Sequence, residues 1–288
     1  MRIEPNQIVD GGTYTENVEN HGTIRGGVFT GKVDNFGAIE GGEFKGEVEV
    51  HPHSSINGGK FSGFVHVQPN ASVNNGEFLG AVKVDGNIKN GKFLNNVDLF
   101  GGIDGGEFKG EVEAHQHSSI SGGKFHSFVH VQPDASVNNG EFLGAVKVNG
   151  TIKNGKFLNN VDLFGGIEGG EFFGTVTAFK GSEISNGIFQ GEIDRYLNTH
   201  IHGRDKIYGP IYLIVTDVMT GRFVRKELEK PAVANPIDEI RKNNDYPAIM
   251  KKAIKKAIEE KNSYLGDQND KNPLDLLALT QDFNDNIL

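Results

Sequence analysis

A single motif recurs along the first two thirds of the chain and limits what the chain can fold into. Its consensus is Gly-Gly-x-Phe-x-Gly-x-Val. Gly lies two positions before every aromatic residue, Val or Ile lies four after it, and Val or Ile also lies five before it. The chain therefore repeats one structural unit. The aromatic residue returns after either 15 or 17 positions, at Tyr14, Phe29, Phe44, Phe61, Phe78, Phe93, Phe108, Phe125, Phe142, Phe157, Phe172 and Phe189.

The spacing of the apolar positions excludes both a helix and one long strand. Intervals of five, four and then six or eight residues fit neither helical periodicity nor alternation, so the chain must turn a corner every few residues. The pattern predicts a mainly β fold, a single-stranded parallel β-solenoid of about 12 coils over residues 1–195. Equivalent positions should stack about 4.8 Å apart. We expect left-handed or crowded corners two residues after the aromatic, at Gly31, Gly46, Gly80, Asn95, Gly110, Gly144 and Asn159.

The residue just before each aromatic is an independent indication of this stacking. Charge alternates there over nine coils, as Glu43, Lys60, Glu77, Lys92, Glu107, Lys124, Glu141, Lys156 and Glu171. In parallel register each Glu lies between two Lys, whereas a slip by one coil would bring like charges together. The alternation therefore predicts parallel strands in register, with this position facing water.

A second and longer repeat exists within the first. Residues 41–104 recur as residues 105–168, with 55 of 64 positions identical. Each coil of a solenoid contacts only its neighbours, so four coils can be added without repacking the rest. An enzyme with one active site gains nothing obvious from such a duplication, whereas a spacer or a multivalent surface does.

The repeat ends after Ile193, and the charge balance changes with it. Residues 1–195 hold 15 Lys and Arg against 24 Asp and Glu, a balance of −9, whereas residues 196–288 hold 14 of each. The segment 207–228 predicts a β-hairpin. Three helices should follow, starting near Pro236, Pro247 and Pro273. We therefore expect residues 196–288 to form a small α+β domain that caps the solenoid and serves in docking or homo-oligomerisation.

Composition excludes several classes of protein. The chain has no Cys, and therefore no disulfide, thiolate metal site or cysteine nucleophile. No apolar run approaches the roughly 18 residues of a membrane span, and the start Met1-Arg-Ile-Glu-Pro lacks the pattern of a secretory signal. We expect a protein that is cytoplasmic, associated with a virion, or exported by a non-classical system.

No group of residues predicts catalysis or a cofactor. The sequence His51-x-His53 recurs as His115-x-His117, and such a turn can bind a metal, but the two copies should lie about 19 Å apart, at four strand spacings. We therefore interpret both as polar corners, without a metal. The acidic residues are repeated and matched by Lys, so we expect no enzyme. One polar cluster is not repeated and is a candidate junction site: His200, His202, Arg204 and Asp205.

Two outward surfaces are candidates for binding a protein partner. The first is an apolar face, since stacked exposed apolar residues are typical of contact surfaces. It consists of Leu79, Leu94, Leu143, Leu158 and Phe173, with Phe64 and Phe128 on a neighbouring face. The second is an acidic face, consisting of Glu47, Glu49, Glu111 and Glu113. A further outward ladder alternates acids with His and Lys, as in Glu49, His66 and Lys83.

In architecture, residues 1–195 resemble repeat β-solenoid proteins, including the bactofilin type of short-coil, filament-forming scaffold. No functional residue carries over from that resemblance. We expect a non-enzymatic rigid rod that is a scaffold and protein-interaction platform, as in a phage particle, a surface assembly or a delivered effector. One alternative is an acidic inhibitor that mimics nucleic acid. A second is a glycan-binding adhesin module. We do not expect the protein itself to bind nucleic acid.

Overall fold

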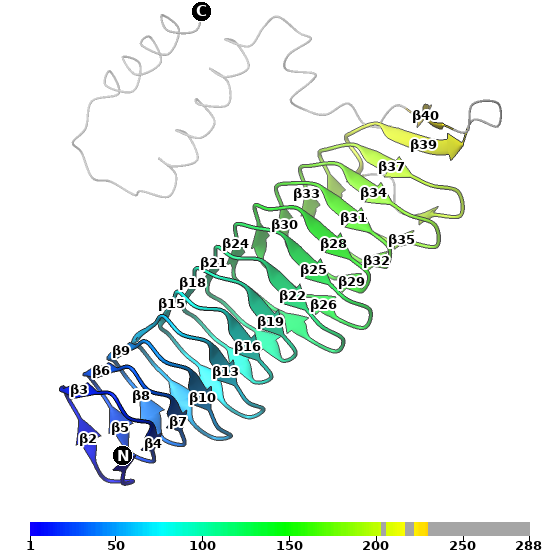
Figure 1. Cartoon of the computed structure of the whole chain (residues 1–288). Coiled ribbons are helices and arrows are strands. Elements are labelled where there is room, and N and C mark those ends of the chain that lie inside the picture. The colour runs from blue at the N-terminus through cyan, green and yellow to red at the C-terminus, as the bar shows by residue number, and fades with distance from the viewer. Residues whose placement is uncertain (203–205, 217–221, 230–288) are drawn as a thin grey trace, which may run out of the picture. The chain divides into compact units, whose positions relative to one another are not determined.

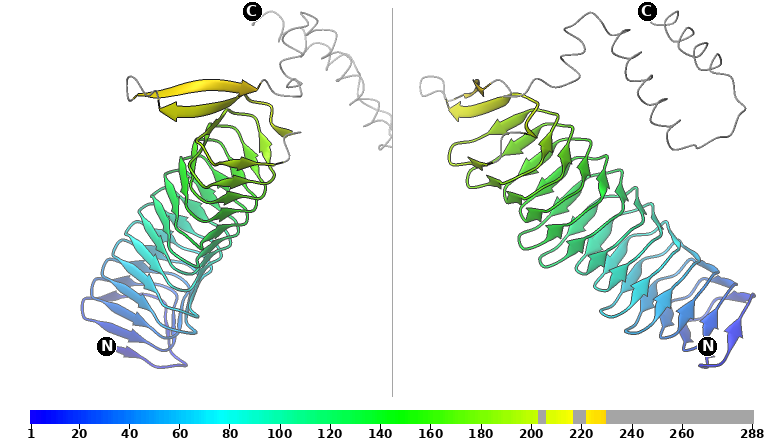
Figure 2. Two further views of the ribbon diagram at one scale, coloured as in Figure 1. Left: turned by 90° about the vertical axis from the view of Figure 1, so that its right-hand side faces the viewer. Right: turned by 180° about the vertical axis from the view of Figure 1, so that it is seen from behind.

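The computed structural model describes residues 1–202, 206–216 and 222–229. All of them belong to the first of two compact units, Met1–Ala234 and Asn235–Leu288. Within this unit the chain winds in about 13 coils of a parallel β-solenoid, whose strands form three long sheets (Figure 1). The N-terminus lies at one end of the stack and the last two strands lie at the other (Figure 2).

Sheet C carries the repeated aromatic residue, which is the second residue of each strand and points inward. Its partner in each strand, the residue just before, faces outward. The strands are β3 (Thr13–Tyr14), β6 (Val28–Phe29), β9 (Glu43–Phe44), β12 (Lys60–Phe61), β15 (Glu77–Phe78), β18 (Lys92–Phe93), β21 (Glu107–Phe108), β24 (Lys124–Phe125), β27 (Glu141–Phe142), β30 (Lys156–Phe157), β33 (Glu171–Phe172) and β36 (Ile188–Phe189).

A strand of sheet A begins four residues after each aromatic residue. All strands of this sheet except the last run parallel. Each of its three-residue strands has an inward, an outward and an inward position. The strands are β1 (Arg2–Ile3), β4 (Val18–Asn20), β7 (Val33–Asn35), β10 (Val48–Val50), β13 (Val65–Val67), β16 (Val82–Val84), β19 (Val97–Leu99), β22 (Val112–Ala114), β25 (Val129–Val131), β28 (Val146–Val148), β31 (Val161–Leu163), β34 (Val176–Ala178), β37 (Ile193–Arg195), β39 (Ile211–Thr216) and β40 (Phe223–Glu229).

Sheet B closes the circuit and places one aliphatic side chain of each strand in the core. Its strands are β2 (Ile8–Val9), β5 (Thr23–Ile24), β8 (Ala38–Ile39), β11 (Ser55–Ile56), β14 (Ser72–Val73), β17 (Asn87–Ile88), β20 (Gly102–Ile103), β23 (Ser119–Ile120), β26 (Ser136–Val137), β29 (Thr151–Ile152), β32 (Gly166–Ile167), β35 (Glu183–Ile184) and β38 (His200–Ile201). The expected 12 coils were one too few, because counting aromatic residues counts only the strands of sheet C.

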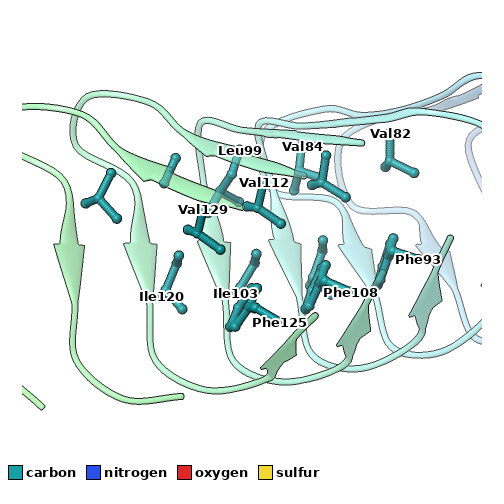
Figure 3. Packing of buried hydrophobic residues seen from close by; sticks show 14 of the residues in the cluster. Val82, Val84, Phe93, Leu99, Ile103, Phe108, Val112, Ile120, Phe125 and Val129 are labelled. Atoms are coloured by element: carbon teal, nitrogen blue, oxygen red, sulfur yellow. The ribbon is translucent and has the colours of Figure 1, made fainter. Parts of the chain in front are cut away.

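The core is a stack of identical layers. In each layer an aromatic side chain from sheet C meets Ile or Val from sheet B and Val from sheet A, as Phe108, Ile103 and Val112 do in Figure 3. Phe108 lies parallel to its two neighbours in the ladder, with ring centroids 4.8 Å away on each side. This distance is the strand spacing, so the hydrogen-bonded backbone sets how the rings pack. One polar pair interrupts the core near the N-terminus, where the buried Asn20 donates to Asn35 Oδ1 at 2.6 Å.

Glycine has two different roles in each coil. The glycine two positions before the aromatic adopts a left-handed backbone, with φ between 103° and 147° in all twelve coils. The glycine two positions after it has no left-handed φ. A Cβ atom on Gly46, for example, would approach the backbone of Gly31 in the preceding coil closer than 3.0 Å. The predicted corner after the aromatic is therefore crowded but not left-handed. The preceding backbone leaves no room for a side chain at Gly46, although Asn95 and Asn159 occupy the same position in other coils.

The shorter and the longer coils differ at one corner, around the ninth position after the aromatic. The longer coils place a turn there, as where the Ser54 N–H donates to His51 O at 3.1 Å. That turn contains a residue with positive φ, such as His53 at 68° and His117 at 67°. The shorter coils close the same corner without the two extra residues, so the three sheets stay in register throughout.

The last two described strands extend sheet A at the C-terminal end of the stack. β39 pairs in parallel with β37, and β40 pairs antiparallel with β39. The hairpin predicted over residues 207–228 is therefore confirmed. The three predicted helices lie outside the described residues, as does most of the predicted cap and docking domain. Within the described part of the chain, no helix has the length and apolarity needed to cross a membrane.

Candidate protein-interaction surface

The alternating charges lie in the predicted register. Positions are counted here from the aromatic residue of each coil, so this ladder occupies position −1. Lys60 pairs with Glu43 on one side and with Glu77 on the other, and the pattern continues to Glu171. Two pairs of neighbours along this ladder form ion pairs within 4 Å among the described residues, Lys92 with Glu77 at 3.9 Å and Lys124 with Glu141 at 3.4 Å. The ladder therefore fixes register more than it adds stability.

The candidate apolar face lies at positions +1 and +3. Its side chains are exposed by 36–43%, except for the half-buried Leu143. Leu79 and Leu94 lie on neighbouring coils, as do Leu143, Leu158 and Phe173. Lys109 and His126 occupy position +1 between these two groups. The structure thus places the residues of position +1 in two groups of neighbouring coils. Each group has a phenylalanine at position +3 of the preceding coil, Phe64 in the first and Phe128 in the second.

A ladder of stacked rings at position +7 was missed in the sequence. Phe36 stacks on His51 with 3.9 Å between ring centroids, and Phe100 stacks on His115 with 4.0 Å. Farther along, Phe164 and Phe179 stack at 4.2 Å. These rings cover one another's faces and expose their edges. Reading position +7 from coil to coil would have found the ladder, because this position recurs with the same spacing as the aromatic residue.

The two His-x-His turns are explained by this ladder. His51 and His115 use their rings to stack on the preceding phenylalanine, whereas His53 and His117 are the left-handed residues of the turns. Among the residues that the structure describes, no cluster of three or more His, Asp and Glu side chains has a geometry that would hold a metal ion.

At position +5, histidine lies between acids. His66 Nδ1 is 2.8 Å from Glu49 Oε1, and its Nε2 is 2.6 Å from Asp85 Oδ2. The duplicated His130 contacts Glu113 at 2.9 Å, but Asn149 takes the place of the second acid. Each histidine therefore contacts one glutamate of the predicted acidic face, His66 contacting Glu49 and His130 contacting Glu113.

In the first copy of the acidic face, a lysine contacts Glu47. Lys32 Nζ lies 3.3 Å from Asp34 and 3.4 Å from Glu47. Burial opposes the charge on this ammonium, but the hydrogen bonds to both carboxylates and their charges outweigh it and raise the pKa of Lys32. Lys32 thus forms a bridge between neighbouring coils.

The raised pKa of Lys32 predicts a pH dependence. Because its folded pKa lies above its unfolded pKa, the bridge contributes stability at pH values below the unfolded pKa, and this contribution is lost as pH rises through the folded pKa. Titration of Lys32 followed by its ¹³Cε chemical shift should give a midpoint above that of the same lysine in urea-unfolded protein. A folded midpoint at or below the unfolded one would contradict the bridge.

A second basic side chain holds acids at the C-terminal end. Arg225 of β40 contacts Glu192 and Asp194, which occupy positions +3 and +5 of the last aromatic coil. Its guanidinium lies 3.7 Å from the ring centroid of Tyr212. Partial burial opposes the charge, but hydrogen bonds to the two carboxylates raise the pKa of Arg225. The last coil and the hairpin are therefore joined by a charged clasp.

The second copy of the acidic face contains a hollow. Glu111 and Glu113 line it together with Asn96, Asp98 and Phe128, and its volume is about 260 Å³. The sequence predicted the two glutamates but not the hollow. A hollow of this kind depends on which side chains neighbour them on the adjacent coils.

The predicted junction site is described only in part. His200 is exposed on β38, and His202 Nε2 lies 3.6 Å from Glu183 Oε1 on the preceding coil. Arg204 and Asp205 lie outside the described residues. The prediction that the four residues form one site therefore stays a prediction.

No protein-family model matches the chain, and neither a curated protein nor a solved structure is similar to it. Proposals about function therefore depend on the architecture and the surface chemistry of the solenoid itself.

Proposed function

We propose that the protein is a non-enzymatic rod, a scaffold and protein-interaction platform whose coils display contact surfaces at fixed spacing. The observation that carries the proposal is the apolar face. It appears twice, once in each copy of the duplicated block, and its side chains are exposed except for the half-buried Leu143. Exposed apolar side chains stacked on one face are typical of protein contact surfaces.

The duplication supports a scaffold more than an enzyme. Equivalent residues of the two copies are four coils apart, or about 19 Å at the strand spacing, so any surface of the first copy is offered again at that distance. The resemblance to filament-forming solenoids of the bactofilin type also favours a scaffold. Residues 196–288 are then proposed as the cap and the docking or oligomerisation module, in a phage particle, a surface assembly or an effector.

The two alternatives have less support. A nucleic-acid mimic needs a row of unpaired charges, whereas three of the four glutamates of the acidic face have a basic neighbour: Glu47 contacts Lys32, Glu49 contacts His66 and Glu113 contacts His130. Stacking of a sugar needs the open face of an aromatic ring. The exposed Phe36 is covered on both sides, by His21 at 4.8 Å and by His51 at 3.9 Å. The first observation counts against the nucleic-acid mimic, and the second counts against the glycan-binding module.

Photo-crosslinking in the cells of the source organism tests the proposal. Leu158 is replaced by p-benzoylphenylalanine in the full chain, and Lys153, which is exposed on the same coil outside the apolar face, is replaced in a matched control. We expect discrete protein adducts from position 158 and none from position 153. Equal labelling from both positions, or no adduct at all, would contradict an interaction platform on this face.

A further inference from the structure

Two basic side chains of this protein show how acids near the outward side of sheet A hold a basic group. Lys32 bridges Asp34 and Glu47 at 3.3 and 3.4 Å, and Arg225 contacts Glu192 and Asp194. In both cases the acids occupy positions +3 and +5, which come from two neighbouring coils around Lys32 and from one coil beside Arg225. Each basic group thus makes charge-assisted hydrogen bonds to two carboxylates, which are stronger than bonds between neutral groups.

A third set of acids at these positions has no base. Four coils further along the chain, the positions equivalent to Lys32, Asp34 and Glu47 carry Asn96, Asp98 and Glu111. Asn96 is neutral, and its amide oxygen accepts the N–H of Glu111 at 3.1 Å instead of facing the acids. Neither Asp98 nor Glu111 has an ion pair within 4 Å in the part of the chain that the structure describes.

The burial of the two equivalent aspartates reflects this difference. Asp34 is half-buried beside Lys32, whereas Asp98 is exposed. The hollow of about 260 Å³ lies here, between Asp98, Glu111, Glu113 and the ring of Phe128. Tyr212 supplies an aromatic wall to Arg225 in the same way. A long basic side chain would lay its methylenes along Phe128 and place its charge among the carboxylates.

We propose that this hollow receives a lysine or arginine side chain from a protein partner. The inference rests on the proposed function, since it names the chemistry by which the platform recognises its partner. This set of acids is not repeated at the next equivalent positions, a further four coils on, which carry Thr175 and Thr177 in place of the two glutamates. One rod therefore takes one basic side chain at this place.

The chain provides its own reciprocal variants for a test. Asn96→Lys should fill the hollow with an internal ammonium, as Lys32 does between Asp34 and Glu47. Lys32→Asn should open a second hollow beside Phe64, lined by Asp34, Glu47 and Glu49. Asn160→Lys makes the same change at the next equivalent position, where Asp162 is the only acid of the set, and is the matched control.

The measurement is an NMR titration of the full chain at low salt with the probe acetyl-Gly-Arg-Gly-amide. We expect saturable shifts of the amides of Asp98, Glu111 and Glu113, with a dissociation constant on the order of 1 mM. Asn96→Lys should weaken binding by about tenfold or more. Lys32→Asn should add a second set of shifts at Glu47 and Glu49, and Asn160→Lys should change nothing.

Several results would overturn the proposal. Shifts that do not saturate, or that Asn96→Lys leaves unchanged, would show that the hollow binds no basic side chain. Glu111→Gln is a second variant that tests the site without replacing the Asn96 hydrogen bond, and undiminished binding there has the same meaning. Spermidine binding more than about tenfold tighter than the peptide would indicate a polyamine as occupant instead. Crosslinks from position 158 that persist while the titration fails would reject the hollow alone and leave the platform standing.

Discussion

Replacing Phe108 by Ala is expected to destabilise the solenoid by about 3–5 kcal/mol, the range for removing a buried aromatic ring from a core. The ring is 1% exposed and stacks on Phe93 and Phe125 at 4.8 Å. Neighbouring coils cannot collapse into the void, because the hydrogen-bonded backbones keep the layers at the strand spacing. Urea denaturation followed by circular dichroism measures the loss.

Phe64→Ala is the matched control, since Phe64 belongs to the same kind of coil but is 43% exposed. Its replacement should change stability by less than about 1 kcal/mol. Equal losses for the two variants would show that the interior ladder is not the source of stability. Loss of signal confined to amides near residue 108 in hydrogen exchange would show local opening of single coils, as expected for a one-dimensional repeat.

Gly165→Ala is expected to be as damaging, by a different mechanism. A Cβ atom there would approach the carbonyl oxygen of Gly150 on the preceding coil closer than 3.0 Å. That oxygen accepts the N–H of Gly166 at 3.0 Å, so it cannot move without breaking the sheet. We expect a loss of about 3 kcal/mol or more in the free energy of unfolding, in line with severe backbone overpacking.

The neighbouring Gly166 is the control for this prediction. The nearest atom to a Cβ at this position is the carbonyl oxygen of Glu183, at 4.0 Å. Gly166→Ala should therefore leave stability unchanged or raise it by about 0.5–1 kcal/mol, because alanine loses less conformational freedom on folding. If both alanine variants proved equally stable, crowding between coils would not explain the glycines of this corner.

The sequence predicted the interior of the solenoid well because each coil repeats the same constraint. Phe108 points inward and Glu107 outward because successive side chains of a strand point to opposite faces, and the same pair of positions recurs in every coil. One period of the repeat therefore identified the fold class, the register and the core. The count of coils was low because Tyr14 and Phe189 mark only sheet C, while β1, β38 and β39 extend the other sheets.

The surface was harder to predict, because its chemistry depends on residues a full coil apart. Glu111 was identified as acidic from the sequence, but the hollow beside it follows from Asn96 on the preceding coil and Phe128 on the next. The bridge from Lys32 to Glu47 likewise joins two coils. Nothing in the period of the repeat distinguishes a position that binds a partner from one that only faces water.

Deleting residues 105–168 tests most directly whether the protein is a stack of interchangeable coils. The deletion joins Asp104 to Gly169, which restores the Gly-Gly-x-Phe unit. The chain has no Cys, so spin labels can be placed on cysteines introduced at Thr30 and Gln190 alone. Both residues occupy position +1, ten coils apart, or about 48 Å at the strand spacing.

Pulsed electron–electron double resonance measures the distance between the two labels in the full chain and in the deletion variant. A folded, shortened rod predicts that the distance between the labels falls by about 19 Å, from about 48 to about 29 Å, with a narrow distribution in both proteins. An unfolded variant, or a distance that does not fall by four strand spacings, would contradict a rod built from independent, stacked coils.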